Sequence, residues 1–455
     1  MTTTIRNTTL FTVTSALAAC FLLSCILSVR GFGATYYWAG SEGAGWSNTA
    51  AWKDVNGTSQ SAFSDSHTYV INPNQVLGGG ATAASRTDVN SNPFPANNLT
   101  VESGGVVVVD STSGVDTLTL NGGALRNYQS GAKTWGDGIN DKIVLTGGST
   151  SQVSLGTNGG ALPIDAFVEG AGNLILRPKS ATRYMQLSKA NTHTGTTTMQ
   201  PDGSEGTFFI NNANALQYST LNLNYDTASE GAVTFNQNST IGGLEDSGVA
   251  ANLNLGGRTI SIGYNDSARD KTFDGDISNG SIIKIGSSTQ RFTGAVSTPV
   301  TVTEGTVVMA GSYTGGTIAL NGGNLNIGSD TTAGDIMSFT TLTLTDGSTI
   351  TWQVDGASGD VLQTSGTLAL GTLSAGAVTI NVDSIGAAPV KNVWYTLFDG
   401  TVSDFNASKF TFSGYNADKW VIGEGSLQIM LIPEPSTAIL AGLGLAGLCL
   451  RRRRR

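Results

Sequence analysis

Cysteine, histidine and charged side chains are all scarce in this 455-residue chain. Its three cysteines, Cys20, Cys25 and Cys449, lie in apolar runs near the two ends, so the body between them can form no disulfide framework, thiolate metal site or cysteine nucleophile. Only 13% of the residues are charged, about half the usual share, which excludes a long-helix or coiled-coil protein.

Glycine, in contrast, is abundant. It occupies 60 positions, about twice its average frequency. Hydrophobic residues still make up 39% of the chain, enough apolar material to argue against simple disorder. The composition therefore indicates a β-rich protein with many turns.

The few charges are distributed unevenly. Without Arg6, Arg30, the terminal run 451–455 and Glu434, residues 35–432 hold 17 basic and 32 acidic residues, a net charge of −15. A body this acidic repels phosphate backbones, so we expect no nucleic-acid partner.

The N-terminus has the pattern of a secretory signal peptide over residues 1–34. Arg6 precedes an uncharged stretch over 10–29, and small residues follow it. Cleavage is expected after Gly33 or Ala34. The sequence thus predicts export through the Sec translocon and removal of the leader by signal peptidase.

Two alternatives to this cleavage remain open. About 20 uncharged residues can also span a bilayer as an uncleaved anchor. Leu17-Ala18-Ala19-Cys20 is similar to a lipoprotein lipobox, although the apolar run continues through Phe21-Leu22-Leu23, where a mature lipoprotein normally turns polar.

Three elements follow one another at the C-terminus. Pro433, Glu434 and Pro435 prevent helix on their N-terminal side, because each proline restricts its predecessor and lacks an amide donor. Residues 436–450 form a predicted transmembrane helix of about 22 Å, short of the roughly 30 Å hydrocarbon core. Five arginines end the chain, and the positive-inside rule places them in the cytoplasm with the body outside: Arg451, Arg452, Arg453, Arg454 and Arg455.

This end resembles the PEP-CTERM sorting signal of Gram-negative and related bacteria. The resemblance implies that the exported chain is held in the inner membrane until an exosortase, a membrane transpeptidase-like enzyme, cuts near Pro433, Glu434 and Pro435. These residues are then a substrate site, and the product belongs to the cell envelope, the outer surface or the extracellular space. An ordinary permanent tail anchor is the alternative, but it does not require Pro-Glu-Pro.

The body repeats one local unit, an alternating strand followed by a tight glycine turn. Thr117-Leu118-Thr119-Leu120-Asn121-Gly122-Gly123 is echoed by Thr317-Ile318-Ala319-Leu320-Asn321-Gly322-Gly323. Looser copies occur at 99–106, 143–149, 252–257 and 342–348. Alternation places Leu and Ile on one face and Thr or Asn on the other, and glycine supplies the positive φ of the turn.

One such unit cannot bury its apolar face alone, so the units must stack. We predict an all-β fold, a right-handed parallel β-helix with coils of roughly 20–25 residues. A β-sandwich or a set of hairpins is the alternative, since Asn-Gly also favours hairpins. The expected division is signal peptide 1–34, N-terminal β cap 35–97, β-helix repeats 98–357, C-terminal β cap 358–432 and sorting signal 433–455.

Part of the body resembles the autotransporter-associated β-strand repeat. The match is Gly172-Asn173-Leu174-Ile175-Leu176 followed by Asn191-Thr192-His193-Thr194-Gly195-Thr196-Thr197-Thr198. His193 replaces the usual aromatic residue, and Gly195 lacks a second glycine beside it. A more degenerate copy covers 280–308. The resemblance implies a passenger-like β-helix without catalytic residues.

The aromatic residues near the N-terminus have two interpretations. Trp38, Trp46 and Trp52 alternate with glycine and small residues. A solenoid end needs a bulky apolar plug, which is the interpretation we favour, whereas aromatics beside glycine can also form a platform for stacking sugars.

Residues suited to catalysis or metal binding are few. His67 and His193 lie in polar, turn-like contexts without a nucleophile-elbow motif, and we interpret both as surface residues. Four carboxylates cluster near a calcium-loop pattern, but its glycine comes one position late and no glutamate follows. They are Asp266, Asp270, Asp274 and Asp276.

The sequence therefore predicts an exported, non-enzymatic structural or adhesive protein of the cell surface or extracellular matrix. No catalytic residue, metal site or cofactor is expected. The expected partners are exosortase, signal peptidase, the Sec translocon, the inner membrane and extracellular polysaccharide. The alternative is a β-helical polysaccharide lyase or glycosidase, in which two carboxylates of the acidic cluster act as acid and base.

Overall fold

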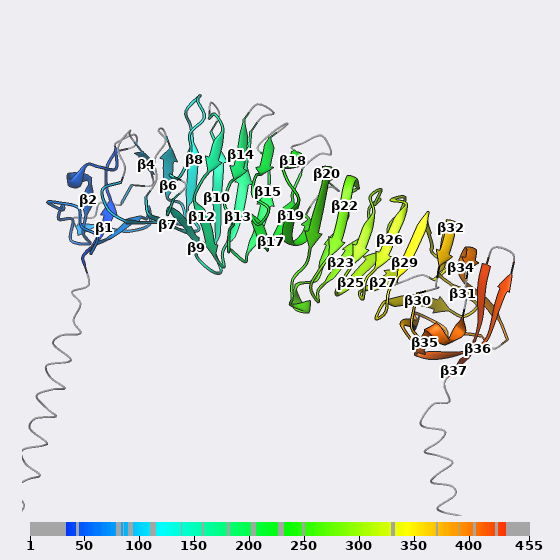
Figure 1. Ribbon diagram of the computed structural model, residues 1–455. Helices are drawn as coiled ribbons and strands as arrows, with labels where there is room; N and C mark the ends of the chain where they lie inside the picture. The colour runs from blue at the N-terminus through cyan, green and yellow to red at the C-terminus, as the bar shows by residue number, and fades with distance from the viewer. Residues whose placement is uncertain are drawn as a thin grey trace, which may run out of the picture.

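The computed structural model describes residues 33–433, apart from 42–44, 79–82, 85, 90–93, 110–114, 138, 157–158, 180–182, 202–205, 226–231, 248–250, 329–332, 370–371, 391, 404–405 and 424–425. Its strands follow one another along a rod, with the first and last strands at opposite ends (Figure 1). Short 3-10 helices interrupt the strands, and those in the described part of the chain include η1 (Thr49–Ala51), η3 (Ser267–Arg269) and η4 (Ala407–Lys409).

Two sheets begin in the N-terminal part of the rod, and the longer of them continues along most of its length. The N-terminal sheet contains β1 (Thr35–Trp38), β2 (Trp52–Lys53), β3 (Thr68–Ile71), β5 (Asn98–Glu102), β7 (Thr117–Asn121), β9 (Lys142–Leu145) and β12 (Phe167–Gly170). The long sheet contains β4 (Arg86–Val89), β6 (Val106–Val109), β8 (Ala124–Asn127), β10 (Thr150–Leu155), β13 (Asn173–Arg177), β15 (Thr196–Met199), β17 (Leu216–Leu223), β19 (Ser239–Asp246), β20 (Leu253–Ile262), β22 (Ile277–Lys284), β24 (Val300–Val302), β26 (Thr317–Leu320) and β29 (Thr341–Leu344).

Three further sheets complete the walls. The four-stranded sheet contains β11 (Leu162–Ile164), β14 (Tyr184–Leu187), β16 (Thr207–Ile210) and β18 (Ala232–Phe235). The eight-stranded sheet contains β21 (Lys271–Phe273), β23 (Thr289–Phe292), β25 (Thr306–Met309), β27 (Asn324–Ile327), β30 (Thr349–Asp355), β31 (Ser358–Gly359), β33 (Val378–Ser384) and β35 (Phe410–Ser413). The five-stranded sheet contains β28 (Ile336–Phe339), β32 (Val361–Ala369), β34 (Trp394–Ser403), β36 (Tyr415–Gly423) and β37 (Ser426–Pro433).

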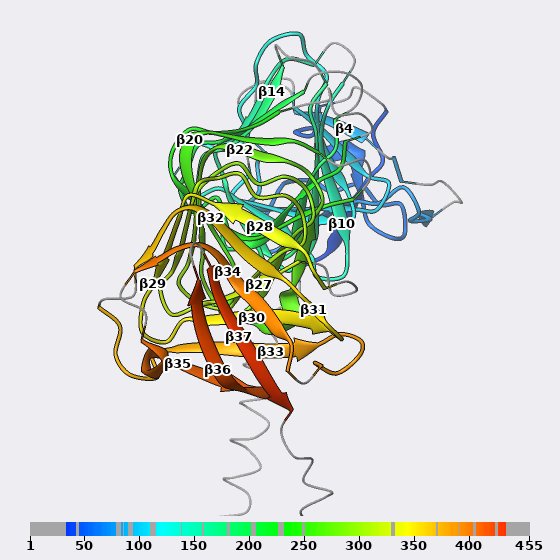
Figure 2. The same ribbon diagram turned by 90° about the vertical axis from the view of Figure 1, so that its right-hand side faces the viewer.

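Almost every pair of neighbouring strands is parallel. Among the described strands, only β1–β2, β30–β31, β34–β37 and β36–β37 pair antiparallel. Near the C-terminus, β30, β33 and β35 form one wall and β32, β34 and β37 another (Figure 2). The chain is therefore an all-β solenoid of stacked coils, and the sandwich alternative does not describe it.

The length of a coil varies along the rod and falls outside the predicted range of 20–25 residues at some positions. Ile282 pairs with Val300, 18 residues on, whereas Val378 pairs with Phe410, 32 residues on. Parallel pairing also runs across residues 97/98 and 357/358, so the ladder itself shows no boundary at the predicted cap positions.

Inward side chains form continuous apolar columns through the stack. One column is fully buried and joins six successive coils of the long sheet: Val107, Leu125, Val153, Leu176, Met199 and Leu223. Burying each of these side chains contributes roughly 1.5–3 kcal/mol. The columns thus supply the core that a single coil cannot form.

Each predicted glycine turn contains a glycine with positive φ, a backbone conformation that other residues rarely adopt. Gly122, after β7, has φ +78°, and a Cβ on the next residue, Gly123, would lie 2.5 Å from both Cγ1 and the carbonyl oxygen of Val101 in the preceding coil. The prediction of positive φ at the repeated turns is confirmed at Gly104, Gly122, Gly148, Gly256, Gly257, Gly322 and Gly347.

Both ends of the rod are closed by departures from the parallel pattern. At the N-terminus, β2 adds antiparallel to β1, and Trp38 contacts Trp52 edge to face at 5.2 Å between ring centroids. At the C-terminus, the β36–β37 hairpin adds antiparallel to β34. These additions cover sheet edges that would otherwise offer a template for another chain.

We predict that replacing Gly123 by alanine destabilises the protein by about 1–3 kcal/mol, because the added Cβ overlaps Val101. The control is Gly131→Ala, where no other group lies within 4 Å of the added Cβ and where alanine leaves stability unchanged or slightly higher. Thermal unfolding followed by circular dichroism compares the two. Equal midpoints for both variants would contradict the close stacking of coils.

Candidate functional sites at the chain ends and on the solenoid wall

The predicted sorting motif begins inside the last strand of the body. Pro433 is the final residue of β37 and lies opposite Tyr415 of β36. Since proline has no backbone N–H, it suits the end of a strand rather than its middle. The folded body therefore extends to the first residue of the motif.

The rest of that motif lies outside the described residues. This applies to Glu434, Pro435, the predicted helix 436–450 and Arg451–Arg455. In the part of the chain that the structure describes, no helix has the length and apolar character needed to span a membrane.

The predicted signal-cleavage positions lie where the chain joins the first coil. The Ala34 backbone N–H donates to Nδ1 of His67 at 3.1 Å, and the Ala34 carbonyl accepts from Thr68 at 3.1 Å. A Cβ on Gly33 would lie 1.5 Å from the carbonyl oxygen of Ser66. Residues 1–32, which hold the predicted leader, lie outside the described residues.

The N-terminal tryptophans form an internal cluster. Trp38, Trp46 and Trp52 have no exposed surface, and Trp46 packs on Phe94 and Trp135 at centroid distances of 5.0 and 6.3 Å. They offer no ring face to a sugar, so the interpretation as an apolar plug is confirmed.

The four clustered aspartates are bound within the fold rather than aimed at one point. Asp266 accepts from the backbone of Ala268 at the start of η3. The others accept from the following coil: Asp270 from the N–H of Thr289, Asp274 from the hydroxyl of Thr293 and Asp276 from the N–H of Ala295. Among the described residues, no group of three or more potential metal ligands occurs.

His193 is buried, so its interpretation as a surface residue is wrong. Only 1% of its surface is exposed, and its Nε2 lies 2.7 Å from the Thr197 hydroxyl. That hydroxyl lies 2.8 Å from Ser219 in the next coil, and Ser219 donates to the Gly195 carbonyl at 2.6 Å. The imidazole thus fills the aromatic position of the repeat that this segment resembles, and the Thr197 hydroxyl takes the place of water at its Nε2.

Tyr313 shows the same arrangement in a later coil. It is 3% exposed, and its hydroxyl donates to the carbonyl of Thr317, four residues on, as His193 contacts Thr197. His67, the other histidine, is half-buried and packs edge to face on Tyr36 at 5.2 Å.

Two buried ionisable groups, Lys284 and Asp360, belong to no sequence motif. Burial lowers the pKa of Lys284 to about 8, and its Nζ donates to the carbonyls of Ile285 and Gly286 at 2.6 and 2.8 Å. Burial raises the pKa of Asp360 to about 7 while one oxygen accepts from the N–H groups of Gly334 and Asp335. Alternation within β22 was the available signal for Lys284, because it places that residue on the inward face.

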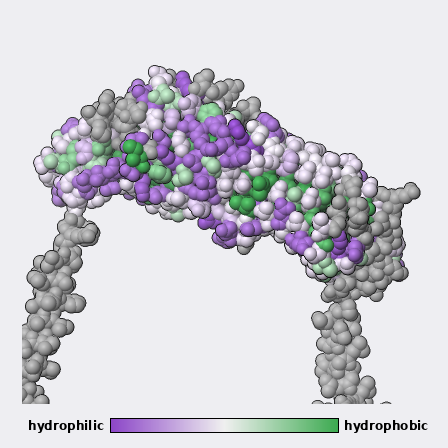
Figure 3. All heavy atoms as spheres, in the orientation of Figure 1, coloured by the Kyte–Doolittle hydropathy of each residue, from purple (hydrophilic) through white to green (hydrophobic). Residues whose placement is uncertain are grey.

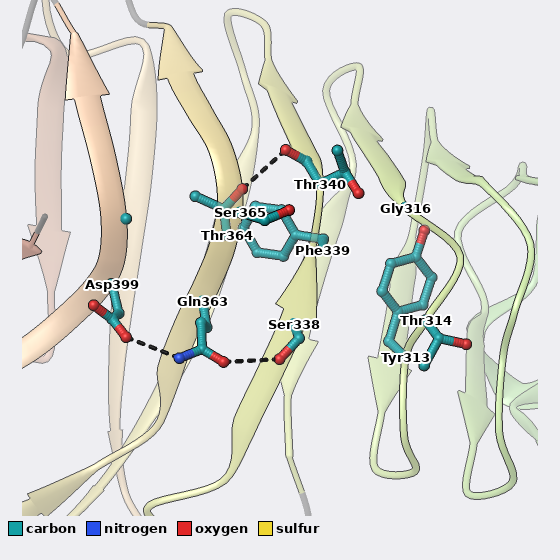
Figure 4. Close-up of a pocket in the computed structure, with 11 residues that line it drawn as sticks. Tyr313, Thr314, Gly316, Ser338, Phe339, Thr340, Gln363, Thr364, Ser365 and Asp399 are labelled. Carbon is teal, nitrogen blue, oxygen red and sulfur yellow. Dashed lines mark hydrogen bonds between the residues drawn. The ribbon is translucent and has the colours of Figure 1, made fainter.

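A pocket of about 380 Å³ opens on the wall of the rod (Figure 4). It crosses the outer side of β28, β32 and β34, and the preceding coil borders it. Its lining residues are Tyr313, Thr314, Gly316, Ser338, Phe339, Thr340, Gln363, Thr364, Ser365, Asp399 and Gly400.

A ladder of polar side chains connects three coils within this pocket. The Ser338 hydroxyl donates to Oε1 of Gln363 at 3.1 Å, and the Gln363 amide donates to Oδ2 of Asp399 at 2.9 Å. This site could not be predicted from the sequence, because its residues lie 25 and 36 positions apart and belong to no motif.

Acid sensitivity is the measurable consequence of the buried His193. Burial lowers its pKa from 6.5 to about 4, so between these pH values the unfolded chain binds a proton that the folded chain does not. The free energy of unfolding should therefore fall by up to about 3 kcal/mol as the pH decreases through this window. Replacing His193 by tyrosine removes this contribution. Thermal midpoints at pH 7.5 and 4.5 should separate the two proteins, and identical pH dependence would contradict the assignment.

The C-terminus is similar to a known protein family. Residues 431–454 match the family model of the PEP-CTERM protein-sorting motif. No curated protein matches the chain. The chain therefore carries a PEP-CTERM sorting motif at the end of an all-strand body, and this motif indicates an exosortase-targeted, extracellular protein.

Proposed function

We propose that the protein is a non-enzymatic structural or adhesive component of the bacterial cell surface or extracellular matrix. The observation that carries this proposal is the sorting motif at 431–454, joined directly to the last strand of a solenoid. An exosortase releases the body by cutting near Pro433, Glu434 and Pro435, and the body then acts outside the inner membrane.

The proposed export route uses both chain ends. Signal peptidase removes the leader near Gly33 or Ala34 after passage through the Sec translocon. The helix 436–450 then holds the chain transiently in the inner membrane, with Arg451–Arg455 on the cytoplasmic side. We expect the coils to be right-handed, because parallel crossover connections strongly prefer that hand.

Two features of the body support a structural or adhesive role over catalysis. The four clustered aspartates each hold a backbone or hydroxyl group of the fold. The wall pocket contains one carboxylate, Asp399, whereas most glycosidases use a pair of carboxylates on either side of the scissile bond.

The surface of the rod also suits an exported scaffold. Polar residues cover much of the face in Figure 3, with hydrophobic residues gathered mainly in its C-terminal half. The body between the ends contains no cysteine and has an excess of acidic groups, so it tolerates an oxidising compartment and resists self-association.

Processing is tested with a C-terminal epitope tag on the full chain. In a host that contains the exosortase, the body should lose the tag, and in an otherwise identical host without the enzyme it should keep it. Glu434→Gln should reduce tag loss about tenfold or more, because it alters the motif itself. Immunoblots of membrane and released fractions measure both effects.

The control is Ser436→Ala, which leaves Pro-Glu-Pro intact and should be processed like the unaltered chain. Equal tag retention in the two hosts would overturn the processing claim. Turnover of a polysaccharide that is lost in Asp266→Asn or Asp274→Asn would instead favour the enzyme alternative.

A further inference from the structure

The wall pocket presents side chains from several coils toward one open space. Ser338 of β28, Gln363 of β32 and Asp399 of β34 lie in a row along the rod (Figure 4). Thr314 and Tyr313 of a preceding coil border the pocket on the other side. A ligand that contacts all of them must extend along the rod axis, across the strands.

The exposed groups are suited to hydrogen-bonding hydroxyls. Ser338, Gln363 and Ser365 are exposed, as are Thr314 and Thr340. Hydroxyl, amide and carboxylate groups together donate and accept hydrogen bonds, which matches a ligand that does both at every position. Among the described residues, none donates to Oδ1 of Asp399, so this oxygen remains available as an acceptor.

The ladder also holds the site in a fixed arrangement. Gln363 is hydrogen-bonded at both its oxygen and its nitrogen, by Ser338 and to Asp399 respectively. Thr364, next to it, donates to the carbonyl of Thr340 at 2.9 Å. Because these side chains are already ordered, binding incurs less of the entropy cost of fixing them.

The charge of the pocket and of the body disfavours anionic ligands. The lining contains Asp399 and no lysine, arginine or histidine. Residues 35–432 carry a formal charge of −15. An anionic polymer is therefore repelled both locally and at long range, and a neutral ligand is favoured.

An extended peptide fits these observations less well. β28 is the edge strand of its sheet, so a peptide would add there through backbone hydrogen bonds. Such a peptide would lie along β28 and leave Gln363 and Asp399, on the next two strands, without a role. The pocket reaches across three strands, which favours a ligand that crosses them.

We propose that this pocket binds a linear, neutral polysaccharide through Ser338, Gln363 and Asp399. The inference rests on the proposed function in that it assigns a ligand class to an adhesive or matrix protein. The saccharide lies across β28, β32 and β34, with its hydroxyls bonded to the polar ladder, while the rings of Phe339 and Tyr313 stay buried beneath it.

The test uses the full-length chain, purified in a mild detergent, and isothermal titration calorimetry. The probes are neutral hexasaccharides of β-1,4-glucose, β-1,3-glucose, α-1,4-glucose and β-1,4-mannose, with a hexamer of galacturonic acid as the anionic comparison. We expect saturable binding of at least one neutral probe and none of the uronic acid hexamer. Gln363→Ala and Asp399→Asn should each weaken binding about tenfold or more.

Asn381→Ala is the matched control. Asn381 accepts from Ser413 of the adjacent coil at 2.7 Å, an equivalent polar contact outside the pocket, so its loss should leave affinity unchanged. Circular dichroism confirms that each variant is folded, and the conservative Asp399→Asn change keeps the test valid if Gln363→Ala unfolds.

The proposal is overturned if none of the neutral probes binds, if the uronic acid hexamer binds as well as they do, or if the control loses affinity equally. Binding of an extended strand peptide that is unaffected by Gln363→Ala would show that β28 acts as a peptide edge instead. Exosortase takes no part in this binding measurement. A failure of the saccharide proposal therefore leaves the processing proposal intact, and the two failures can be distinguished.

Discussion

In-register stacking of parallel coils is the constraint on which the rest of the structure depends. A single coil has too few inward side chains to form a core. In the stack, the inward side chains of successive coils pack on one another, as in the column that begins at Val107 and ends at Leu223. Stacking requires that each turn occupy little space, which is why Gly123 lies against Val101. Stacking also leaves the first and last coils with one uncovered side each. The buried tryptophans close the N-terminal end of the rod, and the β36–β37 hairpin closes the C-terminal end.

The same constraint separates the inside of the rod from the outside. Inward positions must be apolar or, like His193, internally hydrogen-bonded. Outward positions are free of this demand, so polar ladders can form there between coils without loss of the core. The row from Ser338 to Asp399 is such a ladder, and it lies where the wall also forms a pocket. At the C-terminus, the last strand leads directly into the sorting motif, so the rigid body and the sorting signal share Pro433.

Sequence alone predicted what depends on local pattern. Alternation and glycine turns identified the strands around Thr117 and Thr317, the parallel solenoid and the positive φ of Gly122 and Gly322. It could not predict what depends on which coil lies beside which. His193 was assigned to the surface because its neighbours are polar, yet those hydroxyls are what allow its burial. The pocket was missed because coil lengths vary, so residues 25 and 36 positions apart carry no signal that they meet.

The central claim, in-register parallel stacking, is tested most directly by spin labels on paired outward positions. Thr119 of β7 pairs with Val144 of β9, and neighbouring strands are about 4.8 Å apart. In a chain whose three native cysteines are replaced by serine, nitroxides at 119 and 144 should show strong dipolar broadening in the electron paramagnetic resonance spectrum. Labels at Thr119 and Ala319, on β7 and β26, should show none. Absence of broadening for the first pair, or broadening for both, would contradict the stacked solenoid.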